Sequence, residues 1–221
     1  GNNVLPLRLG EIYRSFLLSK KFNLSKSSAI GSIVLERILD CFGLLSFSVI
    51  LLFYPIDQKL KDYIFLVIFG FILLGFLLIF FIKRKKIKKI KFLNDFLDCL
   101  LILKSKYFFR IVITTFSIWL IFWINVHLIQ SALNLNLTIL DSLLILLLST
   151  IAIAIPAAPG MIGTFHIAVI YTMQYLINYQ SEQIDTFSIL LHAYGFITFT
   201  VLGFFYFLKY QTYNFSLNDL Q

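Results

Sequence analysis

The stretch IPAAPGMIGTFH, residues 155–166, follows directly on the apolar run DSLLILLLSTIAIA of residues 141–154. Two prolines and two glycines stand within eight residues, so a regular helix cannot continue through this stretch. The apolar run 142–155 spans about 21 Å as a helix, which is short of a hydrocarbon core about 30 Å thick. We therefore predict that the chain breaks at membrane depth and re-enters. A plain loop between two spans at the membrane surface is the alternative.

A break at membrane depth has chemical consequences. Non-helical backbone survives there only when it is buried in protein or lines a water-filled cavity. The break also leaves the N-terminus of the predicted helix 164–179 pointing inward, with free amides and a positive dipole that suit a phosphate. The histidine at the start of this helix either contacts a ligand or simply makes a hydrogen bond within the fold. The candidate binding residues here are Pro156, Pro159, Gly160, Gly163 and His166.

The composition of the 221-residue chain is that of a membrane protein. Hydrophobic residues make up 59% of it and charged residues 14%, against about 25% charged in soluble domains. Continuous apolar stretches of about 20 residues are long enough to cross a bilayer as helices, and they do not alternate as barrel strands do. We predict an all-α, polytopic transmembrane bundle with re-entrant segments. Its full spans are expected at 28–54, 63–82, 107–133 and 187–210.

A basic run, KRKKIKKIK at residues 83–91, indicates how the chain is oriented. It holds seven of the 19 basic residues, and loops rich in Lys and Arg stay in the cytoplasm. We assign the net charge of +8 to contact with anionic lipid, and not to nucleic acid. The stretch 92–106 has the spacing of an amphipathic helix at the interface. Residues 1–210 are expected to form one transmembrane domain, followed by a short cytoplasmic tail at 211–221.

Charged residues also stand where lipid is expected, in LPLRLGEIYR at 5–14 and LERILD at 35–40. Such side chains cost roughly 2.5 to 3.5 kcal/mol each at the centre of a membrane helix, so they need partners. We predict that Arg37 contacts a carboxylate of Glu11, Glu36 or Asp40. Two interpretations stay open: a self-neutralising network that pins a re-entrant segment, or a headgroup site in which an arginine binds a phosphate with two hydrogen bonds. The candidate residues are Arg8, Glu11, Arg14, Glu36, Arg37 and Asp40.

Several classes of site are not indicated. The chain has no Gly-rich phosphate loop, HExxH, CxxC or GxSxG motif. Its three histidines lack metal-ligand spacing, and its two cysteines, Cys41 and Cys99, suggest neither a disulfide framework nor a metal site. We therefore predict no metal and no cofactor, and we expect that His127 and His192 pack inside the bundle.

Together these motifs resemble the transmembrane region of lysylphosphatidylglycerol synthetases, which also occurs alone as a family of flippase-like integral membrane proteins. The family patterns are close to P-x-R-x-G-E-x-x-R, then E-R-x-x-D, then P-x-x-P-G-x-x-G. This chain matches them in that order and across most of its length. The matching residues are Pro6, Arg8, Gly10, Glu11 and Arg14; Glu36, Arg37 and Asp40; and Pro156, Pro159, Gly160 and Gly163.

The resemblance implies a polytopic inner-membrane protein whose re-entrant segments meet at a central cavity. It also implies movement of a lipid with a polar headgroup, an aminoacylated phospholipid or a lipid-linked sugar, between the leaflets. The family usually has further helices before the first motif, so we expect this bundle to be truncated at its N-terminus. Many members carry an acidic residue where this chain has His166. The soluble aminoacyl-transferase domain of the synthetases is not in this sequence, so we expect no lysyl transfer and no enzyme activity.

Three functions remain in competition at this stage. The first is a flippase or flippase-like transporter. The second is a membrane enzyme that uses Glu11, Glu36 or Asp40 as general acid or base, which the chain supports less because no nucleophile or metal set accompanies these carboxylates. The third is a non-catalytic partner of a separately encoded lipid synthase.

Overall fold

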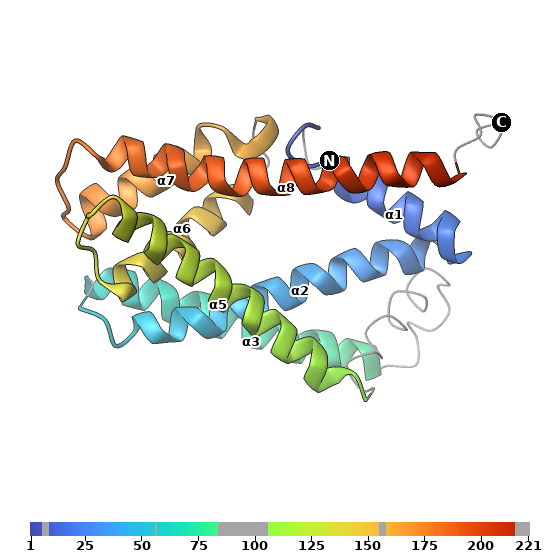
Figure 1. Cartoon of the computed structure of the whole chain (residues 1–221). Coiled ribbons are helices and arrows are strands. Elements are labelled where there is room, and N and C mark those ends of the chain that lie inside the picture. The colour runs from blue at the N-terminus through green and yellow to red at the C-terminus, as the bar shows by residue number, and fades with distance from the viewer. Residues whose placement is uncertain (6–8, 56, 84–105, 155–157, 215–221) are drawn as a thin grey trace.

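The computed structural model describes residues 1–5, 9–55, 57–83, 106–154 and 158–214; for 74–83 and 210–214 it describes the backbone alone. All the elements that it describes are helical (Figure 1). In chain order they are α1 (Leu9–Phe22), α2 (Lys26–Leu51), α3 (Gln58–Lys83), α5 (Phe108–Ala132), α6 (Ile139–Ala154), the 3-10 turn η4 (Pro159–Met161), α7 (Thr164–Tyr171), the π-helical segment η5 (Thr172–Leu176) and α8 (Ile184–Asn214).

The helices lie along one long axis and give the molecule two ends. The connections after α2, α5 and η5 meet at one end, which we call the capped end (Figure 1). The turn between α1 and α2, the start of α5 and the last turns of α8 lie at the other, the basic end (Figure 1). Helix α6 therefore starts at the capped end, and α7 with η5 returns to it. Lysines and arginines gather at the basic end: Lys20, Lys21, Lys26, Lys106, Arg110 and Lys209.

The hydrophobic core occupies the half of the molecule next to the capped end. It joins the last turns of α2 to α5, α6, α7 and η5. Glycine at position 43 allows α2 and α5 to come close, because a Cβ there would lie 2.3 Å from Nε1 of Trp119. Its buried members include Phe47, Leu51, Trp119, Val126, Leu143, Leu144, Ile145, Leu147, Val169, Met173 and Phe187.

A group of three residues at the capped end, Tyr54, Thr138 and Asp141, fixes the start of α6; we call it the capping cluster. The backbone amide and the hydroxyl of Thr138 donate to Oδ2 of Asp141 at 2.8 and 2.7 Å, and the Asp141 amide donates to the Thr138 hydroxyl at 3.1 Å. This is a reciprocal capping box. The Tyr54 hydroxyl donates to the other carboxylate oxygen. Burial, and then the bond to Asp141, raise the pKa of Tyr54, so its hydroxyl stays protonated and donates.

The predicted interruption of the helix is confirmed, while its depth in the membrane and the re-entry stay predictions. Helix α6 ends at Ala154 and α7 begins at Thr164, and the described residues between them form one 3-10 turn in place of a continuous helix. The capping box starts α6 at Ile139, three residues before the predicted run. The predicted helix 164–179 was too long. After α7 and η5 the helical backbone ends at Leu176, because the chain turns through Asn178, at φ 56°, to reach α8.

The predicted spans correspond to α2, α3, α5 and α8, with ends that differ by up to five residues. Among the described residues, two helices are long and apolar enough to cross a membrane by length and composition, Phe108–Ala132 and Ile184–Lys209. Helix α8 continues to Asn214 and includes the first residues of the predicted tail. The amphipathic helix expected at 92–106 and residues 84–91 of the basic run lie outside the described residues, apart from Lys106.

Candidate functional site

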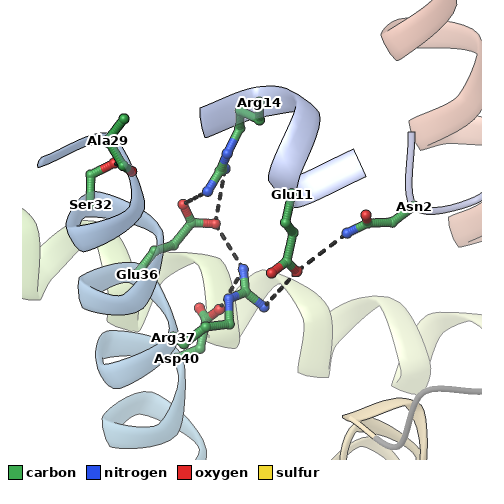
Figure 2. A network of polar contacts seen from close by, with 8 residues as sticks. All are labelled: Asn2, Glu11, Arg14, Ala29, Ser32, Glu36, Arg37 and Asp40. Atoms are coloured by element: carbon green, nitrogen blue, oxygen red, sulfur yellow. Dashed lines mark hydrogen bonds and ion pairs between the residues drawn. The ribbon is translucent and has the colours of Figure 1, made fainter. Parts of the chain in front are cut away.

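Helix α1 packs against the first half of α2 and runs antiparallel to it (Figures 1 and 2). The turn between them is short: Asn23 takes a positive φ of 50°, and the Ser25 hydroxyl caps α2 by accepting from the Ser28 amide at 3.1 Å. Helix α2 is about 39 Å long and α1 about 21 Å, from 26 and 14 residues. The first turn of α1 therefore lies beside the middle of α2.

At this position five charged side chains form one network, which we call the ion-pair network: Glu11, Arg14, Glu36, Arg37 and Asp40. The guanidinium of Arg14 donates to both carboxylate oxygens of Glu36, from Nη1 to Oε1 at 3.2 Å and from Nη2 to Oε2 at 2.6 Å (Figure 2). This two-pronged geometry is available to arginine and not to lysine. Since Arg14 stands on α1 and Glu36 on α2, the pair ties the two helices together.

Arg37 joins the remaining carboxylates of the network. Its Nη2 lies 2.8 Å from Oε1 of Glu36 and 3.2 Å from Oδ2 of Asp40, and its Nη1 lies 4.0 Å from Oε1 of Glu11 (Figure 2). The prediction that Arg37 contacts a carboxylate is confirmed. Glu36 is the centre of the network, because it accepts from both arginines.

The ion-pair network is open on one side. The side chains of Arg14, Glu36, Arg37 and Asp40 are 45, 43, 42 and 42% exposed, and only the Glu11 side chain, at 22%, is more enclosed. Surface ion pairs have such values in any soluble protein. The pairs stand at mid-length of α2, which is about 39 Å long; if α2 spans the membrane, exposed charges at that position require a polar cavity.

The N-terminal segment connects the ion-pair network to the break. The side-chain amide of Asn2 donates to Oε1 of Glu11 at 3.3 Å (Figure 2). The amide of Asn3 donates to the carbonyl oxygen of Phe196 at 3.2 Å and to the hydroxyl of Thr200 at 2.8 Å, both on α8. The Asn3 carbonyl oxygen also lies 3.3 Å from where a Cβ on Gly160 would stand. Two segments more than 150 residues apart in sequence thus meet at mid-length of the molecule.

The backbone of the break has the conformation that its glycines permit. Gly160 has φ 66° and Gly163 φ 92°, and Met161 between them also has a positive φ of 59°. Gly160 is buried, and a Cβ on it would lie 2.7 Å from the ring of Phe196. Gly163 has open space around it, so its positive φ alone requires glycine there.

Helix α8 holds both segments through one row of residues at four-residue spacing, the α8 stripe: Ser188, His192, Phe196 and Thr200. Nε2 of His192 donates to the carbonyl oxygen of Gly160 at 2.7 Å, and the Ser188 hydroxyl lies 3.0 Å from Nδ1 of His166. Sequence analysis missed this row because its members are chemically mixed. The available signal was their four-residue spacing, which places them on one face of a helix.

The predicted site residues fall into three groups. Glu11, Arg14, Glu36, Arg37 and Asp40 come together in the ion-pair network, and Pro159, Gly160, Gly163 and His166 come together around the break. Arg8 and Pro156 lie outside the described residues. Within the part of the chain that the structure describes, no three His, Cys, Asp or Glu side chains gather as a metal ion would require. His127, far from the break in sequence, pairs with Ser142 and Gln130 near the capped end.

Comparison with known proteins agrees with the motifs. A family model described as the lysylphosphatidylglycerol synthase TM region matches residues 1–203. A UPF0104 membrane protein of Methanocaldococcus jannaschii is 30% identical over 185 residues, which cover 78% of this chain and 78% of that protein. No solved structure matches the chain. The resemblance inferred from the three motifs is therefore confirmed: the chain belongs to the family of the lysylphosphatidylglycerol synthase transmembrane region, a family of membrane proteins.

Proposed function

We propose that this protein moves a lipid with a polar headgroup between the two leaflets of the membrane, by way of the ion-pair network and the break. The observation that carries the proposal is the openness of the network: Glu36, Arg37 and Asp40 are each more than two-fifths exposed at mid-length of α2. An exposed charge in hydrocarbon is costly, whereas a charge that lines a polar path serves a headgroup crossing the same depth.

The two sides of this path differ in chemistry. One side is the ion-pair network. There a headgroup phosphate can replace a carboxylate as the partner of an arginine, and a headgroup amino group can replace an arginine as the partner of a carboxylate, so that the charges stay paired. The other is the break, where backbone without helical hydrogen bonds and the first amides of α7 face mid-length. The lipids that fit are those with both charge and hydrogen-bonding groups in the head, an aminoacylated phospholipid or a lipid-linked sugar. We assign no catalytic step to the carboxylates, since Glu36 is held by both arginines.

The proposed arrangement in the membrane follows from the two ends of the molecule. Helices α2, α3, α5 and α8 each cross the inner membrane, while α1 and the α6–α7 pair enter and stop at mid-depth. Because α6 starts at the capped end and η5 returns there, the break adds no crossing. The basic end is cytoplasmic, in agreement with the positive-inside rule.

The proposal is tested by lipid movement in proteoliposomes. The probes are fluorescent lysylphosphatidylglycerol, fluorescent phosphatidylglycerol and a fluorescent polyprenyl-phosphate sugar, each followed by its exposure to an impermeant quencher. We expect at least one probe to cross faster than in protein-free vesicles and Arg14→Lys to slow it by about tenfold, because lysine loses the two-pronged contact with Glu36. Arg110→Lys, at an exposed arginine of α5, is the matched control and should change nothing. If no probe moves, or if Arg14→Lys transports normally, the proposal fails.

The polar path itself can be probed through Cys41, the exposed residue next to Asp40. In a Cys99→Ala background, a charged, membrane-impermeant thiol reagent should label Cys41 in intact proteoliposomes. The control is Ile121→Cys without the native cysteines, at an exposed position in the middle of α5 that lies outside the network. It should stay unlabelled because hydrocarbon surrounds it. Equal labelling at both positions would show that no separate polar path exists.

A further inference from the structure

Two histidines from different helices meet beside the break. The rings of His166 on α7 and His192 on α8 lie 4.8 Å apart, centre to centre, with their planes at 76°. Phe165 and Phe196 stand next to His192, with ring centres at 5.2 and 5.9 Å. Both histidine side chains are partly buried.

Each histidine has one defined hydrogen-bond partner. A carbonyl oxygen only accepts, so Nε2 of His192, 2.7 Å from the oxygen of Gly160, carries a proton and donates it. Nδ1 of His166 faces the hydroxyl of Ser188, which donates or accepts as required. Because His192 uses Nε2 for its bond to Gly160, a second proton can bind its Nδ1 without breaking that bond.

A proton on one histidine of the pair disfavours a second proton on the other. Like charges within about 4 to 6 Å disfavour each other's charged forms. Among the described residues of α6 and α8, the acids stand away from the pair. From α6, Asp141 lies in the capping cluster, and from α8, Asp185 stands seven residues before His192, about 10 Å along the helix.

Helix α5, which also packs on α8, brings Arg110 in its first turn and His127 near the capped end. The N-terminal segment reaches α8 with the uncharged Asn3, and the neighbouring Asn2 bonds to the carboxylate of Glu11 in the ion-pair network. Tyr171 and Tyr175 stack on each other, and Tyr194 is exposed.

We propose that His166 and His192 form a binding site for a single proton, and that this proton sets how firmly the break is held against α8. When His192 takes up the proton, its bond to the Gly160 carbonyl becomes charge-assisted, and such bonds are shorter and about twice as strong as neutral ones. The break is then fastened to α8; when the proton leaves, the break is released more easily. This inference deepens the proposed function. It rests on that function only for its consequence, which is that proton binding gates the path of the lipid.

The test measures the break directly and involves no transported lipid, so its failure would leave the proposed function standing. A nitroxide is attached at Ile162→Cys, an exposed position two residues after Gly160, with Cys41→Ser and Cys99→Ser. The full chain is placed in phosphatidylglycerol nanodiscs, and the EPR line shape is followed between about pH 5 and 8, where histidine titrates. We expect the label to become less mobile as the pH falls, in a transition of one proton.

His192→Gln should remove the transition, because its side-chain amide can still donate to the Gly160 carbonyl but takes up no proton. His127→Gln, at the third histidine, should leave the transition unchanged. A line shape that does not respond to pH in the unmodified pair, a transition that survives His192→Gln, or one that His127→Gln abolishes would each overturn the proposal. If His192→Gln does not fold, His166→Gln decides: coupling requires the midpoint to shift, and an unshifted midpoint refutes the pair.

Discussion

The acidic residues of the capping cluster and those of the ion-pair network differ in burial and in hydrogen bonding. Asp141 is 5% exposed, and both its carboxylate oxygens are occupied, one by Thr138 and the other by Tyr54. Glu36 and Asp40 are 43 and 42% exposed; both contact the guanidinium of Arg37, and Glu36 also binds that of Arg14. The first arrangement lies where helices begin and loops gather, and the second lies at mid-length of the molecule.

The difference separates a structural role from a functional one. A buried carboxylate with all its bonds made stabilises one conformation, and its removal leaves donors unsatisfied. An isolated exposed ion pair adds at most about 1 kcal/mol to stability, and a two-pronged arginine contact within a network adds more than that. In the proposed arrangement the network stands at a membrane depth where exposed charges are costly, which favours a use other than packing.

The largest effect is expected where the break meets α8. Gly160→Val should abolish lipid movement, because valine is strained at φ 66° and its Cβ would collide with the ring of Phe196. Movement is followed in the proteoliposome assay described above. Gly195→Ala, on α8 with nothing within 4 Å of the new Cβ, is the control and should transport normally. Normal transport by Gly160→Val would show that the break does not need its present backbone.

A smaller effect is expected within the ion-pair network. Glu36→Gln keeps the shape but removes the charge that both arginines share, so transport should fall by about tenfold, the change that about 1.4 kcal/mol produces. The melting temperature should fall less than in Asp141→Ala, because the network is exposed whereas Asp141 is buried. Glu182→Gln, at an exposed acid near the capped end, should alter neither quantity. Loss of folding without a specific loss of transport would make the network structural and contradict the comparison.

The capping cluster should give the reverse pattern. Asp141→Ala removes the acceptors of Thr138 and Tyr54 and should cost about 1 to 3 kcal/mol of unfolding free energy. A thermal melt in detergent would record this as a lower midpoint, while transport per folded molecule stays near normal. Asp185→Ala, an exposed acid at the start of α8, should stay within about 0.5 kcal/mol. A transport defect in Asp141→Ala protein that is fully folded would remove the distinction between the two regions.

The final prediction changes neither activity nor stability and concerns which end faces the cytoplasm. In intact cells an impermeant thiol reagent should label Lys59→Cys, in the first turn of α3 at the capped end, but not Lys86→Cys in the basic run. Both variants are made without the native cysteines. Labelling of Lys86→Cys with protection of Lys59→Cys would invert the proposed orientation.

Much of the fold could be predicted because its signals are local. Apolar runs of the right length indicated α2, α3, α5 and α8, and two prolines with two glycines marked the break. The ion pairs of Arg37 were foreseeable too, because Glu36 and Asp40 lie within about one helical turn of it, and an unpaired arginine at that depth is too costly.

The contacts between distant segments could not be predicted in this way. Nothing near Asn3 indicates that it bonds to Thr200, since this bond depends on how α1 and α8 lie in space. His192 was expected to pack inside the bundle, but its bond to the Gly160 carbonyl follows from the path of the break and not from its neighbours in sequence. The predicted helix 164–179 extended beyond the observed end at Leu176, because the turn at Asn178 contains no glycine or proline that would mark it.

The α8 stripe makes the two inner segments mechanically dependent on each other. His192 bonds to the break and Thr200 bonds to the N-terminal segment, about two turns apart on the same face of α8. A rotation of α8 by one residue, about 100°, would turn both contacts away together. Such a rotation of α8 would therefore break the contacts of both segments together and could not break one while leaving the other in place.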